Sequence, residues 1–187
     1  MYLFFNGVSS KWYIGLFDEH QEYITSEEFE IQGNESTKVI PIVDNFLTVN
    51  NISYTDLKNI VVVVWPGSFT WIRSISLVVN TLSYIYPHIY LTPISFFDLY
   101  SRYPIMKISS KRDVFVKYSE SDMIQIVKNE DIELSTIEKI YWDIESERLS
   151  NDREIDSTID YKLCMKNIVL KNTKIVSPLY IKKPNIS

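Results

Sequence analysis

A short run of residues that could do chemistry lies between a long apolar stretch and a longer helical pattern. Pro66, Gly67, Ser68 and Thr70 come directly after the apolar run Ile60–Trp65. A buried strand that turns sharply into a helix gathers backbone N–H groups at the positive end of the helix dipole, and such an arrangement can bind an anion. One hypothesis is therefore a phosphate loop. The alternative is a tight turn in which Ser68 caps the helix.

The loop lacks the residues of two familiar catalytic motifs. No Gly-Lys-Ser or Gly-Lys-Thr follows, so it is not a Walker P-loop, and it does not read G-x-S-x-G, so Ser68 is not indicated as a nucleophile. His20 and His88 are far apart and have no acidic or Cys neighbours at metal-ligand spacing. Cys164 lies in an apolar stretch and is expected to be a packing residue. The sequence therefore indicates no catalytic residue and no metal site.

The loop must be positioned by the elements on either side of it. Ile60–Trp65 has the continuous apolar pattern of a strand that is covered on both faces. The helix predicted after Ser68 spans Phe69–Tyr86, and Pro87 ends it before a second strand at His88–Ile94. A strand, helix and strand in this order predict a parallel pair with a right-handed crossover.

The beginning of the chain predicts an antiparallel meander that leads into a helix. Its three extended stretches, Tyr2–Asn6, Trp12–Phe17 and Glu22–Ile31, are joined by short polar turns. Ser36 is the predicted N-cap of a helix that runs to about Val49. The whole pattern is that of an α/β protein.

The second half of the chain is less regular. Strands are predicted at Ile105–Ile108, Val114–Tyr118 and Met123–Val127, and a helix from about Asp156 to Leu170. A soft boundary before Ile105 suggests an N-terminal α/β lobe with the interaction helices, residues 1–102, and a shortened C-terminal lobe with a tail, residues 103–187. No internal repeat is visible in the sequence.

Composition restricts the classes of function. The net charge is −5 and the pI is about 5.1, which argues against an autonomous nucleic-acid binder because such proteins normally carry a basic patch. The single cysteine cannot form an internal disulfide, so a reducing compartment is expected. No signal peptide or membrane span is predicted, since the apolar run at the start is short and no long uncharged apolar segment follows. A cytoplasmic protein without membrane contact is expected.

Two predicted helices carry more apolar surface than their own core requires. A helix that packs on one sheet needs one apolar stripe, but the helices at 36–49 and 69–86 are apolar or uncharged over wider arcs. Either a second layer of the same chain covers the excess, or it forms a subunit interface. A charge at Val43 or Leu77 is expected to weaken such an interface. The predicted interface residues are Val39, Ile42, Val43, Phe46, Arg73, Ser76, Leu77, Asn80 and Tyr84.

Read together, these residues resemble the TsaB (YeaZ) family. The family's loop G-P-G-S-F-T-G-x-R corresponds to Trp65–Arg73, which keeps P-G-S-F-T and the arginine but has Trp65 and Trp71 in place of the outer glycines. The family's tail P-x-Y-x-R-x-P corresponds to Pro178–Pro184. The opening strand of the family usually contains an Asp, and Asn6 stands in its place.

The resemblance implies an actin/Hsp70/sugar-kinase-like (ribonuclease H-like) fold of two related lobes, the second one reduced. It also implies a non-catalytic subunit that binds a TsaD-like transferase through the two helices or pairs with a second copy of itself. With a TsaE-like ATPase, the family's complex forms N6-threonylcarbamoyladenosine at position 37 of tRNAs that read codons starting with A. On this interpretation tRNA is contacted only indirectly, and any ATP or ADP belongs at the partner interface.

Substitutions in the loop disfavour independent nucleotide chemistry. Asn6 lacks the charge of a metal-binding Asp, and Trp65 and Trp71 bring bulk where glycine would let a phosphate approach the backbone. Asn6, Pro66, Gly67 and Ser68 therefore remain only as a degenerate cofactor loop, and the chain is expected to have no cofactor of its own. The alternatives are a nucleotide-dependent phosphotransferase of the sugar-kinase fold and a degenerate homodimeric interaction protein.

Overall fold

A computed structural model describes the chain except for residues 10, 31–34, 111, 129–138, 143–153 and 179–187. The described residues fall into two units. The first contains Met1–Phe96 and the described residues from Met165 onward, and the second contains Phe97–Cys164. The described residues after Cys164 thus belong to the same unit as the beginning of the chain. The tail motif from Leu179 onward lies outside the described residues.

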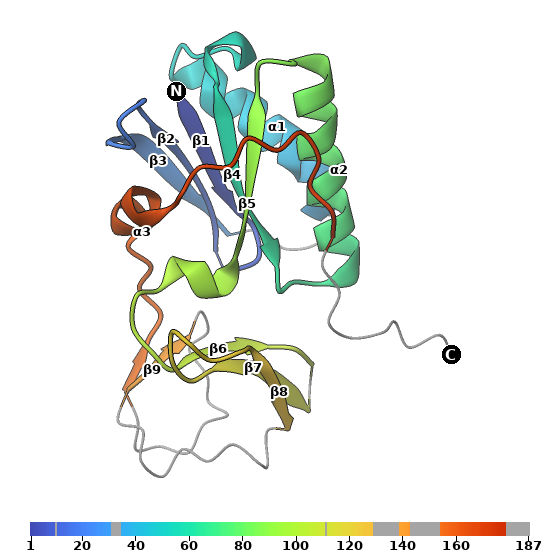
Figure 1. Cartoon of the computed structure of the whole chain (residues 1–187). Helices are drawn as coiled ribbons and strands as arrows, with labels where there is room; N and C mark the ends of the chain where they lie inside the picture. The colour runs from blue at the N-terminus through green and yellow to red at the C-terminus, as the bar shows by residue number, and fades with distance from the viewer. Residues whose placement is uncertain (10, 31–34, 111, 129–138, 143–153, 179–187) are drawn as a thin grey trace. The chain divides into compact units, whose positions relative to one another are not determined.

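The first unit is built on a five-stranded sheet in the order β3-β2-β1-β4-β5 (Figure 1). β1 pairs antiparallel with β2 and β2 with β3, while β4 is parallel to both β1 and β5. The predicted meander and strand–helix–strand unit are therefore confirmed. The elements are β1 (Tyr2–Asn6), β2 (Trp12–Phe17), β3 (Tyr23–Phe29), α1 (Glu35–Val49), a 3₁₀ turn (Tyr54–Asp56), β4 (Asn59–Trp65), α2 (Phe69–Ile85) and β5 (Tyr90–Ser95).

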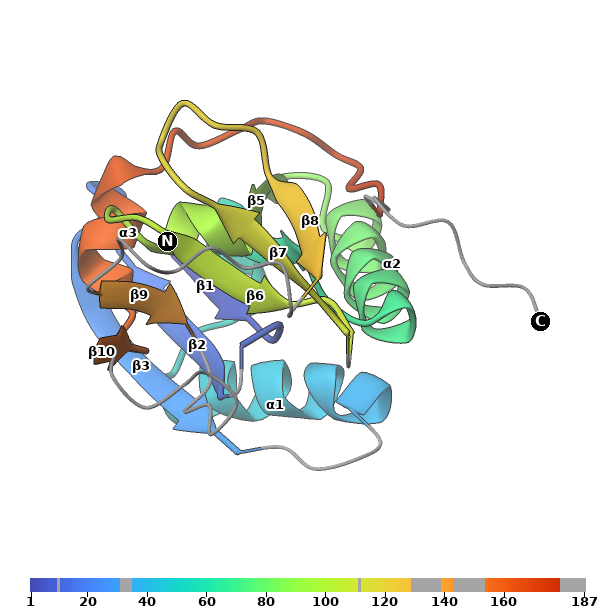
Figure 2. The ribbon, with the colours of Figure 1, turned by 90° about the horizontal axis from the view of Figure 1, so that it is seen from below.

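The centre of this sheet is covered on both faces. All residues of β2 and β4 are buried, as expected for a sheet with a layer on each side. α1 and α2 contact each other. α1 lies on one face of the sheet, whereas the segment after α3 (Tyr161–Asn167) crosses the opposite face and then reaches α2 (Figures 1 and 2). We call this segment, residues 168–178, the strap.

Two predicted helix starts are wrong. α1 begins at Glu35, so Ser36 lies inside the helix and cannot be its N-cap. The helix predicted from Asp156 begins only at Tyr161, because Asp156 belongs to the strand β10 (Glu154–Asp156). Its cap is Asp160, whose carboxylate accepts a hydrogen bond from the Leu163 N–H at 2.9 Å. None of the helices in the described ranges combines the length and apolarity that crossing a membrane requires.

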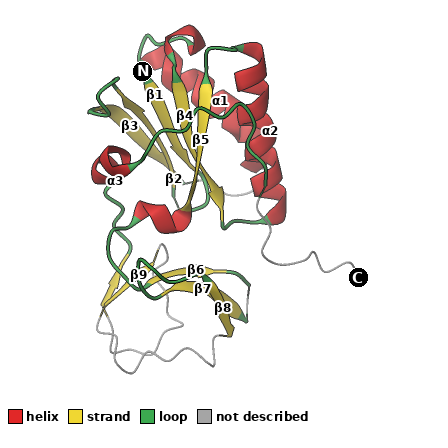
Figure 3. Cartoon of the chain, in the orientation of Figure 1, coloured by secondary structure: helices red, strands yellow, loops and turns green. Residues whose placement is uncertain are grey.

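The second unit repeats the strand order of the first one with shorter strands (Figure 3). Its sheet has the order β8-β7-β6-β9-β10, in which β6, β7 and β8 form an antiparallel meander and β9 and β10 add in parallel. Its core contains Met106, Val114, Val116 and Ile140. The repeat was not visible in the sequence, because strand order is set by pairing and burial rather than by residue identity. The remaining elements are a 3₁₀ helix (Phe96–Leu99), β6 (Ile105–Ile108), β7 (Asp113–Lys117), β8 (Gln125–Lys128) and β9 (Lys139–Trp142).

Candidate functional site: a closed loop and an exposed helix

The loop after β4 has the capping geometry that the sequence predicts. Ser68 has extended backbone angles, and its hydroxyl accepts a hydrogen bond from the Trp71 N–H at 3.2 Å. Its carbonyl accepts from the Ile72 N–H at 2.9 Å. Pro66 is buried, whereas Gly67 and Ser68 are exposed. Ser68 is therefore the N-cap of α2, and its hydroxyl already serves the helix.

The Trp71 side chain fills the space beside this loop. Only 3% of Trp71 is exposed, and its ring lies 4.4 Å from the Trp12 ring and 6.3 Å from the Phe5 ring, between centroids. A Cβ atom built on Gly7 would overlap Trp71 Cζ2 and lie 3.0 Å from Cε2, and one built on Gly67 would lie 3.4 Å from Cδ1. One indole thus packs against both glycine segments, Gly7 after β1 and Gly67 after β4.

Asn6 shapes the turn after β1. Its side chain is fully buried, its Oδ1 accepts from the Val8 N–H at 3.1 Å, and its Nδ2 donates to the Ser9 hydroxyl at 2.7 Å. An asparagine that bonds the backbone two residues onward is typical of a tight turn. Trp65, the other unusual residue of the loop motif, is buried at the end of β4 and pairs with Ser95.

We predict that ADP with Mg²⁺ leaves the melting temperature of the isolated chain unchanged, because Trp71 occupies the space beside the loop. A ligand at a concentration of 100 times its Kd would stabilise the folded state by about 2.7 kcal/mol and raise the melting temperature by several degrees. Differential scanning fluorimetry checks this prediction, with inorganic phosphate as a second probe. A shift of several degrees that saturates with ADP would contradict it.

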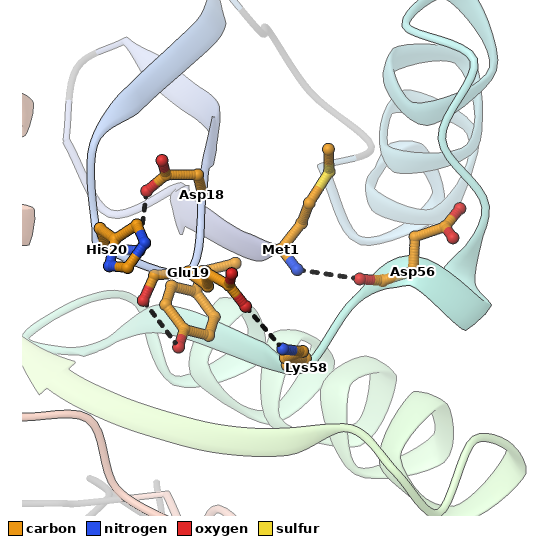
Figure 4. Close-up of polar contacts among 7 residues, drawn as sticks. Met1, Asp18, Glu19, His20, Asp56 and Lys58 are labelled. Atoms are coloured by element: carbon orange, nitrogen blue, oxygen red, sulfur yellow. Dashed lines mark hydrogen bonds and ion pairs between the residues drawn. The ribbon is translucent and has the colours of Figure 1, made fainter.

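Ionisable groups gather at the opposite end of the strands, around the N-terminus (Figure 4). The Met1 ammonium donates to the Asp56 carbonyl, Lys58 pairs with Glu19 at 3.0 Å, and the Asp18 carboxylate accepts from the His20 N–H at 2.8 Å. A backbone hydrogen bond from Glu22 lowers the pKa of Asp18, and the hydrogen bond from Lys58 lowers the pKa of Glu19. The Asp18 carboxylate therefore stabilises the turn after β2, and the Lys58–Glu19 pair links that turn to the residue before β4.

The Cys164 thiol has the properties of a packing residue. It is 6% exposed, donates to the Asp98 carbonyl at 3.4 Å, and has its pKa raised to about 12 by burial. Since the thiolate is the reactive form, we predict almost no reaction with Ellman's reagent at pH 8 in the folded protein and one thiol per chain in guanidinium. Rapid stoichiometric labelling of the folded chain would contradict this. Within the described residues, no group of His, Cys, Asp and Glu could hold a metal ion.

Some of the residues predicted for an interface are buried in the structure and others are exposed. Val39, Val43, Phe46 and Ser76 are buried in the first unit's own core, so they do not form an exposed surface. A charged residue at position 43 would be buried in that core and would destabilise the fold. It therefore cannot test an interface in the way that the sequence suggested. The error has a physical cause: an apolar or uncharged arc that is wider than one stripe does not show which part of it faces the sheet.

The exposed part of the prediction lies mainly on α2. Leu77 is 69% exposed and Tyr84 is 85% exposed. Together with the exposed Arg73 and Thr81, they follow one another at intervals of three or four residues, so they share one side of the helix. We call Arg73, Leu77, Thr81 and Tyr84 the α2 stripe. Ile42 and Asn80 are half-buried, and the Arg73 guanidinium lies 3.8 Å from the centroid of the Phe69 ring.

Two functional features were missed in the sequence. The contact between Gly7 and Trp71 joins segments that are far apart in the chain. The sequence contains two hints of it: Gly7 lies in a turn, and Trp71 stands where the loop motif of the TsaB family has a glycine. Asn80 was assigned to a partner surface, but its side-chain amide bonds both backbone groups of Val176 in the strap. No pattern of hydrophobic residues predicts such a contact.

Comparison with known proteins identifies the fold. No protein-family model matches the chain, and no curated protein matches it in sequence. Among solved structures, YeaZ from Pseudomonas aeruginosa superposes with a TM-score of 0.61 at 14% sequence identity, covering 75% of this chain and 74% of that one. An uncharacterized Pseudomonas aeruginosa protein with similarity to peptidase YeaZ gives a TM-score of 0.60 at 13% identity, with the same coverage. The chain therefore has the mixed α/β, ribonuclease H-like fold of the YeaZ structures.

Proposed function

We propose that this chain is a TsaB-like, non-catalytic subunit that binds a TsaD-like transferase and supports the formation of N6-threonylcarbamoyladenosine at position 37 of tRNAs reading codons that start with A. The observation that carries the proposal is the α2 stripe, which exposes Leu77 and Tyr84 on a helix of a YeaZ-like fold. Two large apolar side chains seven residues apart on one helix side are typical anchors for a groove on a partner. The TsaD-like partner would supply the metal, the nucleotide and the catalytic residues, and it would make the contact with tRNA. A TsaE-like ATPase would join the complex, which would act in the cytoplasm.

The closed loop supports a subunit rather than a phosphotransferase. A phosphotransferase needs a phosphate to approach backbone N–H groups closely, and the Trp71 indole lies directly against Gly7 and near Gly67. Peptidase chemistry needs a nucleophile that is hydrogen-bonded to a base. Within the described part of the chain, the imidazole of His88 contacts the Tyr54 carbonyl, and neither His20 nor His88 bonds a serine, threonine or cysteine side chain.

The modified nucleoside itself tests the proposal. Depleting this chain in its own organism should lower the N6-threonylcarbamoyladenosine content of bulk tRNA, measured by mass spectrometry of digested tRNA. Expression of the wild-type chain should restore the content, and expression of Leu77→Asp should not. An unchanged content in cells that lack the chain would overturn the proposed function, including its partner.

A further inference from the structure

The strap is attached to the rest of the first unit through many polar contacts and one buried apolar side chain. The Leu91 N–H at the edge of β5 donates to the Thr173 carbonyl at 2.8 Å, and the Thr173 hydroxyl donates to the Leu91 carbonyl at 3.1 Å. The Lys171 carbonyl accepts from the Asn59 side chain at 2.9 Å. Val176 is 2% exposed, but two other apolar side chains of the strap, Val169 and Ile175, are 83% and 72% exposed.

Asn80 fastens the far end of the strap to α2. Its Nδ2 donates to the Val176 carbonyl at 3.0 Å, and its Oδ1 accepts from the Val176 N–H at 2.8 Å. A single side chain thus pairs with both backbone groups of one residue, as a neighbouring strand would. Since the strap also pairs with β5, it connects α2 to the edge of the sheet. Its attachment point on α2, Asn80, is the neighbour of Thr81 in the α2 stripe.

We propose that Asn80 and the strap form a latch that opens without unfolding of the core and, when closed, holds α2 in position for its partner. Fixing an extended segment costs conformational entropy that is comparable with the net gain from its hydrogen bonds. A segment with one buried apolar side chain therefore opens more readily than the fully buried β4. The positioning role rests on the proposed function, because it assumes that a partner binds the α2 stripe. A partner that prefers the closed latch must in turn keep it closed.

Hydrogen exchange at the Leu91 amide tests the latch directly, because that amide donates to the strap. In the full-length wild-type chain it should exchange faster than the amide of Val62 in the middle of β4. Asn80→Ala should accelerate exchange at Leu91 by about tenfold or more, because it removes both bonds to Val176. Lys174→Met should act similarly, because Lys174 donates to the Pro87 and Ile89 carbonyls and lies 3.6 Å from the centroid of the Tyr90 ring.

The matched control is Asn172→Ala, which changes the same residue type at an exposed strap position. It should leave the Leu91 exchange rate unchanged, and no variant should accelerate exchange at Val62. Exchange of Leu91 in the wild-type chain at the rate of Val62 would overturn the latch. Equal rates in Asn80→Ala and Asn172→Ala would also overturn it.

Partner affinity separates the latch from the proposed function. Asn80→Ala and Lys174→Met should each weaken binding of the TsaD-like subunit about fivefold or more, and Asn172→Ala should not. Faster exchange with unchanged affinity in both variants would overturn the positioning role while the proposed function stands. A wild-type chain that does not bind at all would overturn both the proposed function and the positioning role, whereas the exchange rates would still decide the latch itself.

Discussion

Replacing Leu77 with Asp is expected to weaken binding of the TsaD-like subunit by about 100-fold or more. The side chain is 69% exposed in the isolated chain, so a partner seated on the α2 stripe would bury it. Truncation of a hot-spot residue costs about 2 kcal/mol or more, and a carboxylate adds the cost of burying an unpaired charge. Titration calorimetry with the purified subunit measures the change in Kd.

The folded state should hardly be affected by this substitution. Exposed positions usually tolerate changes within about 0.5 kcal/mol, so the melting temperature of Leu77→Asp should stay close to that of the wild type. Met123→Asp is the matched control, since Met123 is an apolar side chain of the second unit that is 86% exposed. It should bind like the wild type. Equal affinities for Leu77→Asp and the wild type would show that the α2 stripe is not the interface.

The largest effect on stability is expected from the contact between Gly7 and Trp71. Trp71→Ala removes a ring that packs against Trp12 and Phe5 and should lower the free energy of unfolding by about 3–5 kcal/mol. Gly7→Ala alone should cost about 1–3 kcal/mol, because the new methyl group would overlap the indole. Urea unfolding followed by circular dichroism measures both losses.

The double variant tests whether the indole causes the effect at Gly7. In the Trp71→Ala background the space beside Gly7 is open, so Gly7→Ala should cost much less than in the wild type. The coupling energy should reach about 1 kcal/mol or more, as expected for residues in contact. Gly67 offers a milder comparison, because a Cβ there would lie 3.1 Å from Val8 and 3.4 Å from Trp71. Strictly additive losses at Gly7 and Trp71 would contradict the packing described here.

Local sequence patterns were sufficient to predict most of the first unit. The continuous apolar run predicted β4, the helical period of apolar residues predicted α2, and Ser68 was predicted as the N-cap of α2. These predictions succeed because each pattern depends on residues that are neighbours in the sequence. The resemblance in the loop motif pointed to the fold that the YeaZ structures share. The exposure of Leu77 and Tyr84 also followed from the helix pattern.

Contacts between distant segments could not be predicted in this way. The direction of the Trp71 ring depends on Trp12 and Gly7, which lie on other elements. The path of the strap depends on side-chain bonds from Asn59 and Asn80 to its backbone, and an asparagine carries no signal of its partner. For the same reason Ser76 was predicted as an interface residue, although it is buried.

Formation of a complex with the partner subunit tests the central claim most directly. The wild-type chain and a TsaD-like subunit from the same genome should be mixed at about 10 µM each and examined by sedimentation velocity, with each protein also run alone. We expect a new, faster boundary with the mass of a heterodimer, which Leu77→Asp abolishes and Met123→Asp preserves. Two unchanged boundaries in the wild-type mixture would contradict the account.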